Sequence, residues 1–154
     1  MTEDQDHHFM GEALRQAKKA FAADEVPVGA VVVFENQIIA KAYNQVELLK
    51  DATAHAEMIA ITQAAAALGN WRLTGCDLYV TKEPCPMCAG AMVLSRLRKV
   101  FYGAPDAKSG AAGGWINLLN ETRLNHRCET AQGLRQDECA GLLVEFFKAK
   151  RALP

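Results

Sequence analysis

The sequence predicts an α/β fold in which helices cover both faces of a mixed sheet. Runs of β-branched residues come as a close pair near the N-terminus. Further along, short strand-like runs alternate with stretches of helical periodicity, which favours parallel strand pairing there. Hydrophobic residues make up 50% of the 154 residues, enough for one sizeable core. With no repeat or linker, we expect a single domain over residues 1–154.

The first third of the chain predicts a helix followed by a hairpin. Apolar residues recur at helical spacing over residues 6–23. Val28–Phe34 is a β-branched run, a polar turn follows it, and Ile38–Ala40 returns as the second strand. We expect a loop over residues 43–51, and a solvated tail that includes His7 and His8.

The rest of the chain alternates between predicted helices and strands. The expected helices cover residues 53–68, 86–94 and 136–151, and the expected strands cover residues 78–81 and 100–102. Thr53 suits the cap of the first of these helices, and Pro86 suits the first position of the second. Residues 103–114 contain four of the eleven glycines and are expected to form a loop.

Charge and cysteine content restrict the classes of function. The formal net charge is -1, so any RNA binding requires a local basic patch rather than a generally basic surface. Five cysteines are an odd number in a chain that does not need disulfides to fold, which favours metal binding or free thiols. No apolar run approaches the ~18 residues of a membrane span, and the first eight residues lack the apolar core of a signal peptide. We therefore expect a cytoplasmic protein that contacts no membrane.

Two short segments, residues 53–57 and 83–88, carry metal-binding chemistry. Cys85 and Cys88 are three positions apart and share one face of a first helical turn. The start of a helix also favours thiolate over thiol. His55 lies at the start of another helix. Convergence of these two helix starts places one imidazole and two sulfurs, which are donors that zinc prefers, around one ion.

Three protein ligands predict a catalytic rather than a structural zinc site, with one zinc per chain. Structural zinc is usually enclosed by four protein ligands, whereas catalytic zinc keeps one position for water. Bound zinc lowers the pKa of that water from ~15.7 to about 7. Glu57 lies two residues after His55, where it can take a proton from the water without coordinating the metal.

A Cys-x-x-Cys pair is also typical of redox sites and of zinc knuckles. A redox pair leaves His55 and Glu57 without a role. Half of a zinc knuckle requires a second close cysteine pair, but the remaining cysteines are scattered singles that are expected to be small buried hydrophobic residues: Cys76, Cys128 and Cys139. The full pattern His-x-Glu followed by Pro-Cys-x-x-Cys is the known signature of zinc-dependent base deaminases.

The sequence resembles the bacterial tRNA-specific adenosine deaminases over nearly its whole length. The similarity lies in Asn44, residues 25–30, 53–57, 83–91, 106–113 and 125–127, and the last helix from Asp137 to Phe147. The resemblance implies a cytidine-deaminase-like three-layer α/β/α sandwich, usually a homodimer. It also implies hydrolytic deamination of adenosine to inosine at the wobble position, 34, of tRNA anticodons.

The resemblance also implies a set of substrate and RNA contacts: Asn44, Ala56, Asp106, Lys108, Asn125, Lys150 and Arg151. Each has a purely structural alternative. An asparagine after a strand is typical of an Asx turn, and cations at the end of a helix complement its dipole. A glycine-rich loop can be flexible filler. Pro105 and Lys82 depart from the family pattern, where arginine and leucine are common.

Two rival functions remain open. Guanine deaminases share the Pro-Cys-Pro-Met-Cys motif, and only residues 106–113 and 125–127 favour RNA over a free base. A noncatalytic, zinc-stabilised RNA-binding subunit is the second rival. Such subunits lack the proton-shuttling glutamate, whereas this chain has Glu57.

Overall fold

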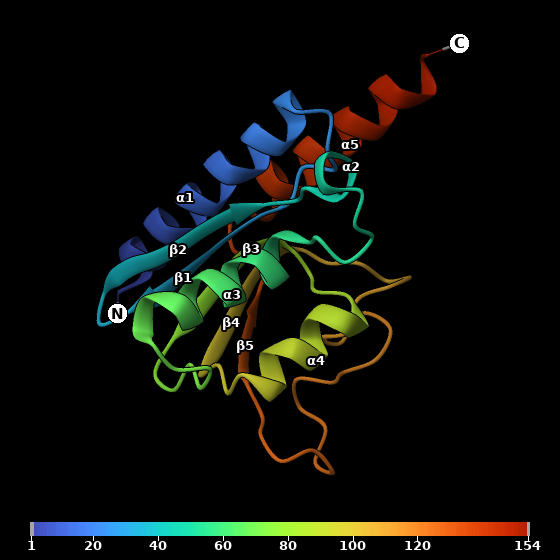
Figure 1. The fold of residues 1–154 in the computed structure, drawn as a ribbon. Coiled ribbons are helices and arrows are strands. Elements are labelled where there is room, and N and C mark those ends of the chain that lie inside the picture. Colours follow the sequence, from blue (N-terminus) through green and yellow to red (C-terminus); the bar gives the residue numbers. More distant parts are fainter. Residues whose placement is uncertain (1, 154) are drawn as a thin grey trace.

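A five-stranded mixed sheet separates two pairs of helices in the computed structural model, which describes residues 2–153 (Figure 1). The sheet order is β2-β1-β3-β4-β5, and these strands span Gln37–Tyr43, Gly29–Phe34, Asp77–Lys82, Lys99–Ala104 and Glu129–Gln132. β1 pairs antiparallel with β2 and β3, whereas β3 and β5 both pair parallel with β4. The predicted hairpin and the predicted parallel pairing are both confirmed.

The helices form the two outer layers. α1 (Glu3–Ala22) and α5 (Gln136–Arg151) lie on one face of the sheet, and α3 (Ala56–Leu68) and α4 (Pro86–Leu94) lie on the other (Figure 1). The short helix α2 (Val46–Leu49) follows β2. This arrangement confirms the predicted three-layer sandwich.

Alternation along the strands divides the core between the two faces. Val31 and its partner Tyr79 pack with α1 and α5, while the neighbouring pair Val32 and Leu78 packs with α3 and α4. Phe101 stacks on Tyr79 with ring centroids 4.3 Å apart. Both faces of the central strands are therefore buried, which explains why their sequences are almost continuously apolar.

The expected N-terminal tail is wrong. α1 begins at Glu3 because Thr2 and Gln5 form a capping box, in which each side chain bonds the other residue's backbone N–H. His7 and His8 are thus exposed residues of a helix rather than of a frayed tail. Within residues 2–153, no helix is both long and apolar enough to cross a membrane.

Several elements in the rest of the chain also differ from expectation; β2, for example, extends beyond Ala40 to Tyr43. The structure forms α2 inside the expected loop 43–51, and it extends β4 through Gly103 and Ala104. β5 was not predicted, since its sequence Glu-Thr-Ala-Gln has no apolar alternation. It forms an edge strand because hydrogen bonds to β4 stabilise it, although its own sequence has little strand propensity.

Candidate active site

The sheet topology brings two helix starts to one edge of the molecule. β2 runs antiparallel to β1, and β1 runs antiparallel to β3, so β2 and β3 point in the same direction. Their carboxyl ends lie at the same edge of the sheet, beside the N-termini of α3 and α4 (Figure 1). His55 directly precedes α3 and Cys85 directly precedes α4. Residues thirty positions apart in the sequence therefore meet.

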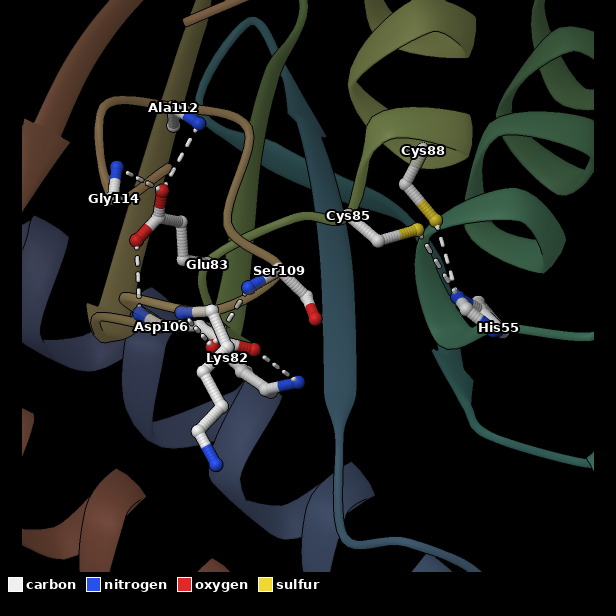
Figure 2. A network of polar contacts seen from close by, with 10 residues as sticks. His55, Lys82, Glu83, Cys85, Cys88, Asp106, Ser109, Ala112 and Gly114 are labelled. Carbon is white, nitrogen blue, oxygen red and sulfur yellow. Dashed lines mark hydrogen bonds and ion pairs between the residues drawn. The ribbon is translucent and has the colours of Figure 1, made fainter. Parts of the chain in front are cut away.

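His55, Cys85 and Cys88 form one potential metal-binding group. The Nδ1 atom of His55 lies 3.4 Å from Sγ of Cys88 and 3.6 Å from Sγ of Cys85 (Figure 2). One ligand atom from each residue lies within 4.8 Å of the others, and within residues 2–153 the group has three members. One nitrogen and two sulfur donors suit a metal ion such as zinc, and three ligands leave a coordination position for water.

Each of the two helices has a candidate ligand at its N-cap position. The side chains of His55 and Cys85 make no capping hydrogen bond in their own helices. Asn44 compensates at α3, because its Oδ1 accepts the backbone N–H of Ala56 at 2.7 Å. The predicted cap at Thr53 is wrong, because His55 occupies the N-cap position. The backbone N–H and the hydroxyl group of Thr53 both donate instead to the carboxylate of Asp51.

The electrostatics of the cysteine pair favour one thiolate even without an ion. A hydrogen bond from Cys88 lowers the pKa of Cys85 to about 4, with a further contribution from His55. The same hydrogen bond, together with burial, raises the pKa of Cys88. The hydrogen bond with Cys85 also raises the pKa of His55. The thiolate is the form in which a cysteine binds a metal ion.

Glu57 lies in the first turn of α3 and is buried beside the metal-binding group. Only 4% of its surface is exposed, yet it lines the same cavity as His55 and Cys85. Burial raises the pKa of its carboxyl group, while its own backbone N–H and the charge of His55 oppose the rise. This carboxyl group is placed to exchange protons within the cavity.

A cavity of about 1000 Å³ opens beside this group. Its walls come from the segment between α1 and β1, from α2, from the end of β3 and from α5. The lining residues are Ala23, Asp24, Glu25, Val26, Val28, Tyr43, Asn44, Val46, Glu47, Leu48, His55, Glu57, Lys82, Glu83, Cys85, Phe146, Phe147 and Lys150. A cavity of this size lies at the upper end of the range typical of small-molecule sites.

The predicted contact residues of the glycine-rich loop lie next to this cavity. Asp106 pairs with Lys82, their charged atoms lying 3.0 Å apart, and it also accepts the backbone N–H groups of Lys108 and Ser109. Desolvation works against ionisation of Asp106, but Lys82 and these two N–H groups hold its pKa below the ordinary value. Lys108 itself is exposed.

The predicted cations of α5 divide between the cavity and its surroundings. Lys150 lines the cavity, forms an ion pair with Asp24 and lies 5.4 Å from the ring centroid of Phe146. Arg151 is exposed at the last position of the helix. Lys150 is thus already partnered by a rim carboxylate in the absence of RNA.

Asn125 is not brought to the cavity wall. It is exposed, and its neighbour His126 contacts the carbonyl oxygen of Leu97, with 2.7 Å between Nε2 and that oxygen. Leu97 follows the C-terminal end of α4, whereas the candidate ligand Cys88 lies in the first turn. The contact of His126 thus places this segment at the C-terminal end of α4, away from the start of the helix.

Two buried carboxylates of the cavity had no predicted role. Glu25 is 2% exposed and accepts the backbone N–H groups of Glu47 and Leu48, which fixes α2. Glu83 is 3% exposed and accepts three backbone N–H groups of the glycine-rich loop. Each lies in a segment singled out by the sequence, but neither neighbouring sequence reveals the distant N–H donors.

Comparison with known proteins places the chain among deaminases. A family model described as MafB19-like deaminase matches residues 3–151. A Bacillus subtilis protein named tRNA-specific adenosine deaminase is 52% identical, covering 96% of this chain and 91% of its own length. A protein of the same name from Aquifex aeolicus is 51% identical, covering 94% of this chain and 95% of its own length.

Solved structures agree with this placement. One, from a study of A-to-I editing by tRNA:A34 deaminases at the wobble position, is 44% identical with a TM-score of 0.85, and covers 88% of this chain and 99% of its own. A guanine deaminase from Nitrosomonas europaea is 27% identical with a TM-score of 0.78, and covers 91% of this chain and 83% of its own.

Proposed function

The chain belongs to the family of tRNA-specific adenosine deaminases, and we propose that it converts adenosine to inosine at wobble position 34 of tRNA anticodons. The observation that carries the proposal is a His-Cys-Cys group beside a buried glutamate in a cavity of about 1000 Å³. The relatives' names supply the substrate. The reaction is hydrolytic: water and adenosine give inosine and ammonia.

The proposed cofactor is one zinc ion per chain, held by His55, Cys85 and Cys88. The donor set of one imidazole nitrogen and two sulfurs fits zinc, and the buried carboxyl of Glu57 beside it fits a catalytic rather than a structural site. When bound, zinc supplies an activated water molecule as the nucleophile for C6 of adenine.

Glu57 is the proposed proton carrier. Its carboxylate accepts one proton from the water and delivers it to N1 of the purine. It then takes the remaining proton from the hydroxyl group added at C6 and passes it to the amino group; the C–N bond breaks, the C6 carbonyl forms and ammonia leaves. Burial at 4% exposure keeps bulk solvent from competing for these transfers. Its place two residues after His55 on the first turn of α3 fixes it beside the reacting atoms.

Asn44 is the proposed contact to the bound nucleoside, and Ala56 supports it through a backbone hydrogen bond rather than by the predicted contact of its own. Because Oδ1 of Asn44 accepts the N–H of Ala56, the amide nitrogen of Asn44 is the group that remains to donate to the base or ribose. The backbone N–H of Ala56 is engaged by Asn44, so its proposed contribution is to fix that side chain. Asn44 is thus proposed to have two roles: its side-chain oxygen caps α3, and its side-chain nitrogen contacts the substrate.

The RNA strand is proposed to cross the cavity rim. Lys150 and Arg151 supply phosphate contacts from α5, and Asp106 and Lys108 supply contacts from the loop that borders Lys82. Asn125, at the far end of α4, reaches RNA only outside the cavity. Each cavity-wall lysine must exchange its aspartate partner for a phosphate to take part.

The assembly and location of the protein are proposals as well. We propose a homodimer that buries the outer faces of α3 and α4, where Leu94 is 70% exposed and Ala66 and Ala67 are exposed. We also propose a single-domain protein of the cytoplasm, which is consistent with five cysteines that form no disulfide within residues 2–153.

Guanine deamination is the second candidate, because a guanine deaminase shares the fold over most of both chains. Both candidates are purine deaminations, so contacts to the edge of the base and to flanking nucleotides must discriminate between them. The test compares kcat/KM for an anticodon stem-loop with adenosine at position 34, free adenosine, free cytidine and free guanine. We expect the stem-loop to be deaminated far faster than any free compound. If guanine is the best substrate, the proposed function is wrong.

A further inference from the structure

The loop between β4 and β5 is suspended from one buried side chain, that of Glu83. Oε1 of Glu83 accepts the backbone N–H of Asp106 at 2.9 Å, and Oε2 accepts those of Ala112 at 3.0 Å and Gly114 at 2.8 Å (Figure 2). The segment after Glu83 adds one more bond, because the carbonyl of Pro84 accepts the N–H of Ala111. Residues 105–114, the first part of this loop, are therefore fixed to the residues that lead into Cys85.

At two positions of this loop, the same carboxylate leaves no room for a side chain larger than that of glycine. A Cβ atom at Gly110 would overlap the carboxyl group of Glu83, and one at Gly114 would lie 2.7 Å from Oε1. Both positions also approach the carbonyl oxygen of Asp106. The backbone closes around the carboxylate so tightly that no side chain fits between them.

The suspended loop borders the cavity through two lining residues. Glu83 and Lys82 both line the cavity, and Lys82 pairs with Asp106 from the solvent side while Glu83 holds its backbone from the buried side. Cys85 lies only two residues further along the same segment. One short stretch of chain thus fixes both the metal-binding group and the loop.

We propose that Glu83 is a positioning residue for RNA: it holds the loop of residues 105–114 in register with the metal-binding group, so that flanking nucleotides and the reacting base are bound together. This inference rests on the proposed function, since it takes the bound strand to be RNA. Glu83 is not one of the three candidate metal ligands, and its two carboxylate oxygens are occupied by the loop N–H groups. It acts through Asp106 and Lys108.

Glu83→Gln is the discriminating substitution. A carboxylate offers acceptors at both oxygens, and three N–H donors point at it. Glutamine has almost the same volume but replaces one oxygen with an NH2 group. If its oxygen keeps Ala112 and Gly114, its NH2 faces the N–H of Asp106, and two donors oppose each other. The end of the loop that carries Asp106 is then released.

The matched control is Asp77→Asn. Asp77 is 2% exposed and begins β3, whereas Glu83 follows the end of the same strand. Its carboxylate pairs with Arg98, away from the cavity. Asp77→Asn therefore removes a buried charge from the same strand without touching the loop.

The experiment measures the Kd for an adenosine-34 stem-loop, kcat on it and metal per chain, for the metal-loaded parent and both variants. We expect Glu83→Gln to raise Kd about tenfold with kcat within about threefold and metal unchanged, because it removes binding that ground and transition states share. Asp77→Asn should leave Kd unchanged. An unchanged Kd in Glu83→Gln, loss of its metal, a fall in kcat that exceeds the rise in Kd, or an equal rise in Asp77→Asn would each overturn the proposal.

Gly110→Ala tests the same contact if Glu83→Gln does not fold, because the added Cβ meets the carboxyl group of Glu83 first and pushes the loop away while leaving Glu83 intact. The same rise in Kd supports the proposal, and an unchanged Kd overturns it. Failure of the proposed function gives a different result. A parent protein that binds the stem-loop without deaminating it contradicts the function, whereas the role of Glu83 is still tested by the Kd of its variants. A parent that does not bind the stem-loop overturns both.

Discussion

The two sides of the cavity are built on different physical principles. On the metal side, Cys88 has no exposed surface, and His55 and Cys85 lie at the starts of helices packed into the core. On the RNA side, the side chains of Lys82 and Lys150 are 34% and 37% exposed, and each pairs with an aspartate. Chemistry requires fixed atoms, whereas strand binding sums several screened contacts. We therefore expect substitutions to reduce deamination most at the metal-binding group and least at the lysines of the cavity rim.

The largest expected effect follows from removing a metal ligand. Cys88→Ser replaces a buried soft donor with a hard one, so metal per chain should fall toward zero and deamination by at least about 10⁴-fold, since the acceleration depends on the ion. Elemental analysis and a stem-loop assay measure both. Cys128→Ser, at a buried cysteine outside the group, should keep the metal. A fully metallated, active Cys88→Ser would remove Cys88 from the site.

Glu57→Gln should give the next largest loss, because it removes the proton carrier and preserves shape. We expect kcat to fall by about 10²–10⁴-fold while metal content and Kd for the stem-loop stay at parental values. Single-turnover rates with saturating enzyme provide the measurement. Parental kcat would exclude Glu57 from the proton transfers, and loss of metal would make it a ligand.

Asn44 lies between the two sides and allows its two tasks to be separated. Asn44→Ala removes the acceptor for the N–H of Ala56 and should cost about 1 kcal/mol of stability, as for a lost helix cap. Asn44→Asp keeps that acceptor but lacks the NH2 donor, so it should fold as stably as the parent. Both should lose about tenfold or more in kcat/KM, the effect of one hydrogen bond. Thermal melts and kinetics together test this; an active Asn44→Asp would limit Asn44 to capping.

The smallest effects belong to the rim cations. Replacing Lys150 and Arg151 by Ala together should weaken stem-loop binding, largely keep kcat at saturation, and flatten the salt dependence of Kd by a little under one unit of slope per lost contact. Lys148→Ala, an exposed cation of the same helix end, is the control. Conversely, Asp24→Asn should tighten binding slightly, because it frees Lys150 for phosphate. Unchanged Kd and slope in the double variant would assign these cations to the helix dipole alone.

Secondary structure could be predicted from the sequence where local interactions stabilise it, but not where contacts between distant residues do. The hairpin, the parallel strands and four of the helices follow from periodicity in the local sequence. α2 and β5 escaped prediction because each has only four residues and is held from outside, α2 by Glu25 and β5 by pairing with β4. Short elements gain their stability from tertiary contacts, which local propensity does not contain.

The candidate ligands and the proposed proton carrier could be named from the local pattern of His55, Glu57, Cys85 and Cys88, because the turn of a helix fixes which neighbours share a face. The residues that support this group became visible only in the folded protein. Asn44 caps α3 and Glu83 holds the glycine-rich loop, and these partners are distant along the chain. Backbone N–H groups occur at every residue, so the sequence cannot name which of them a buried carboxylate will meet until the fold brings them together.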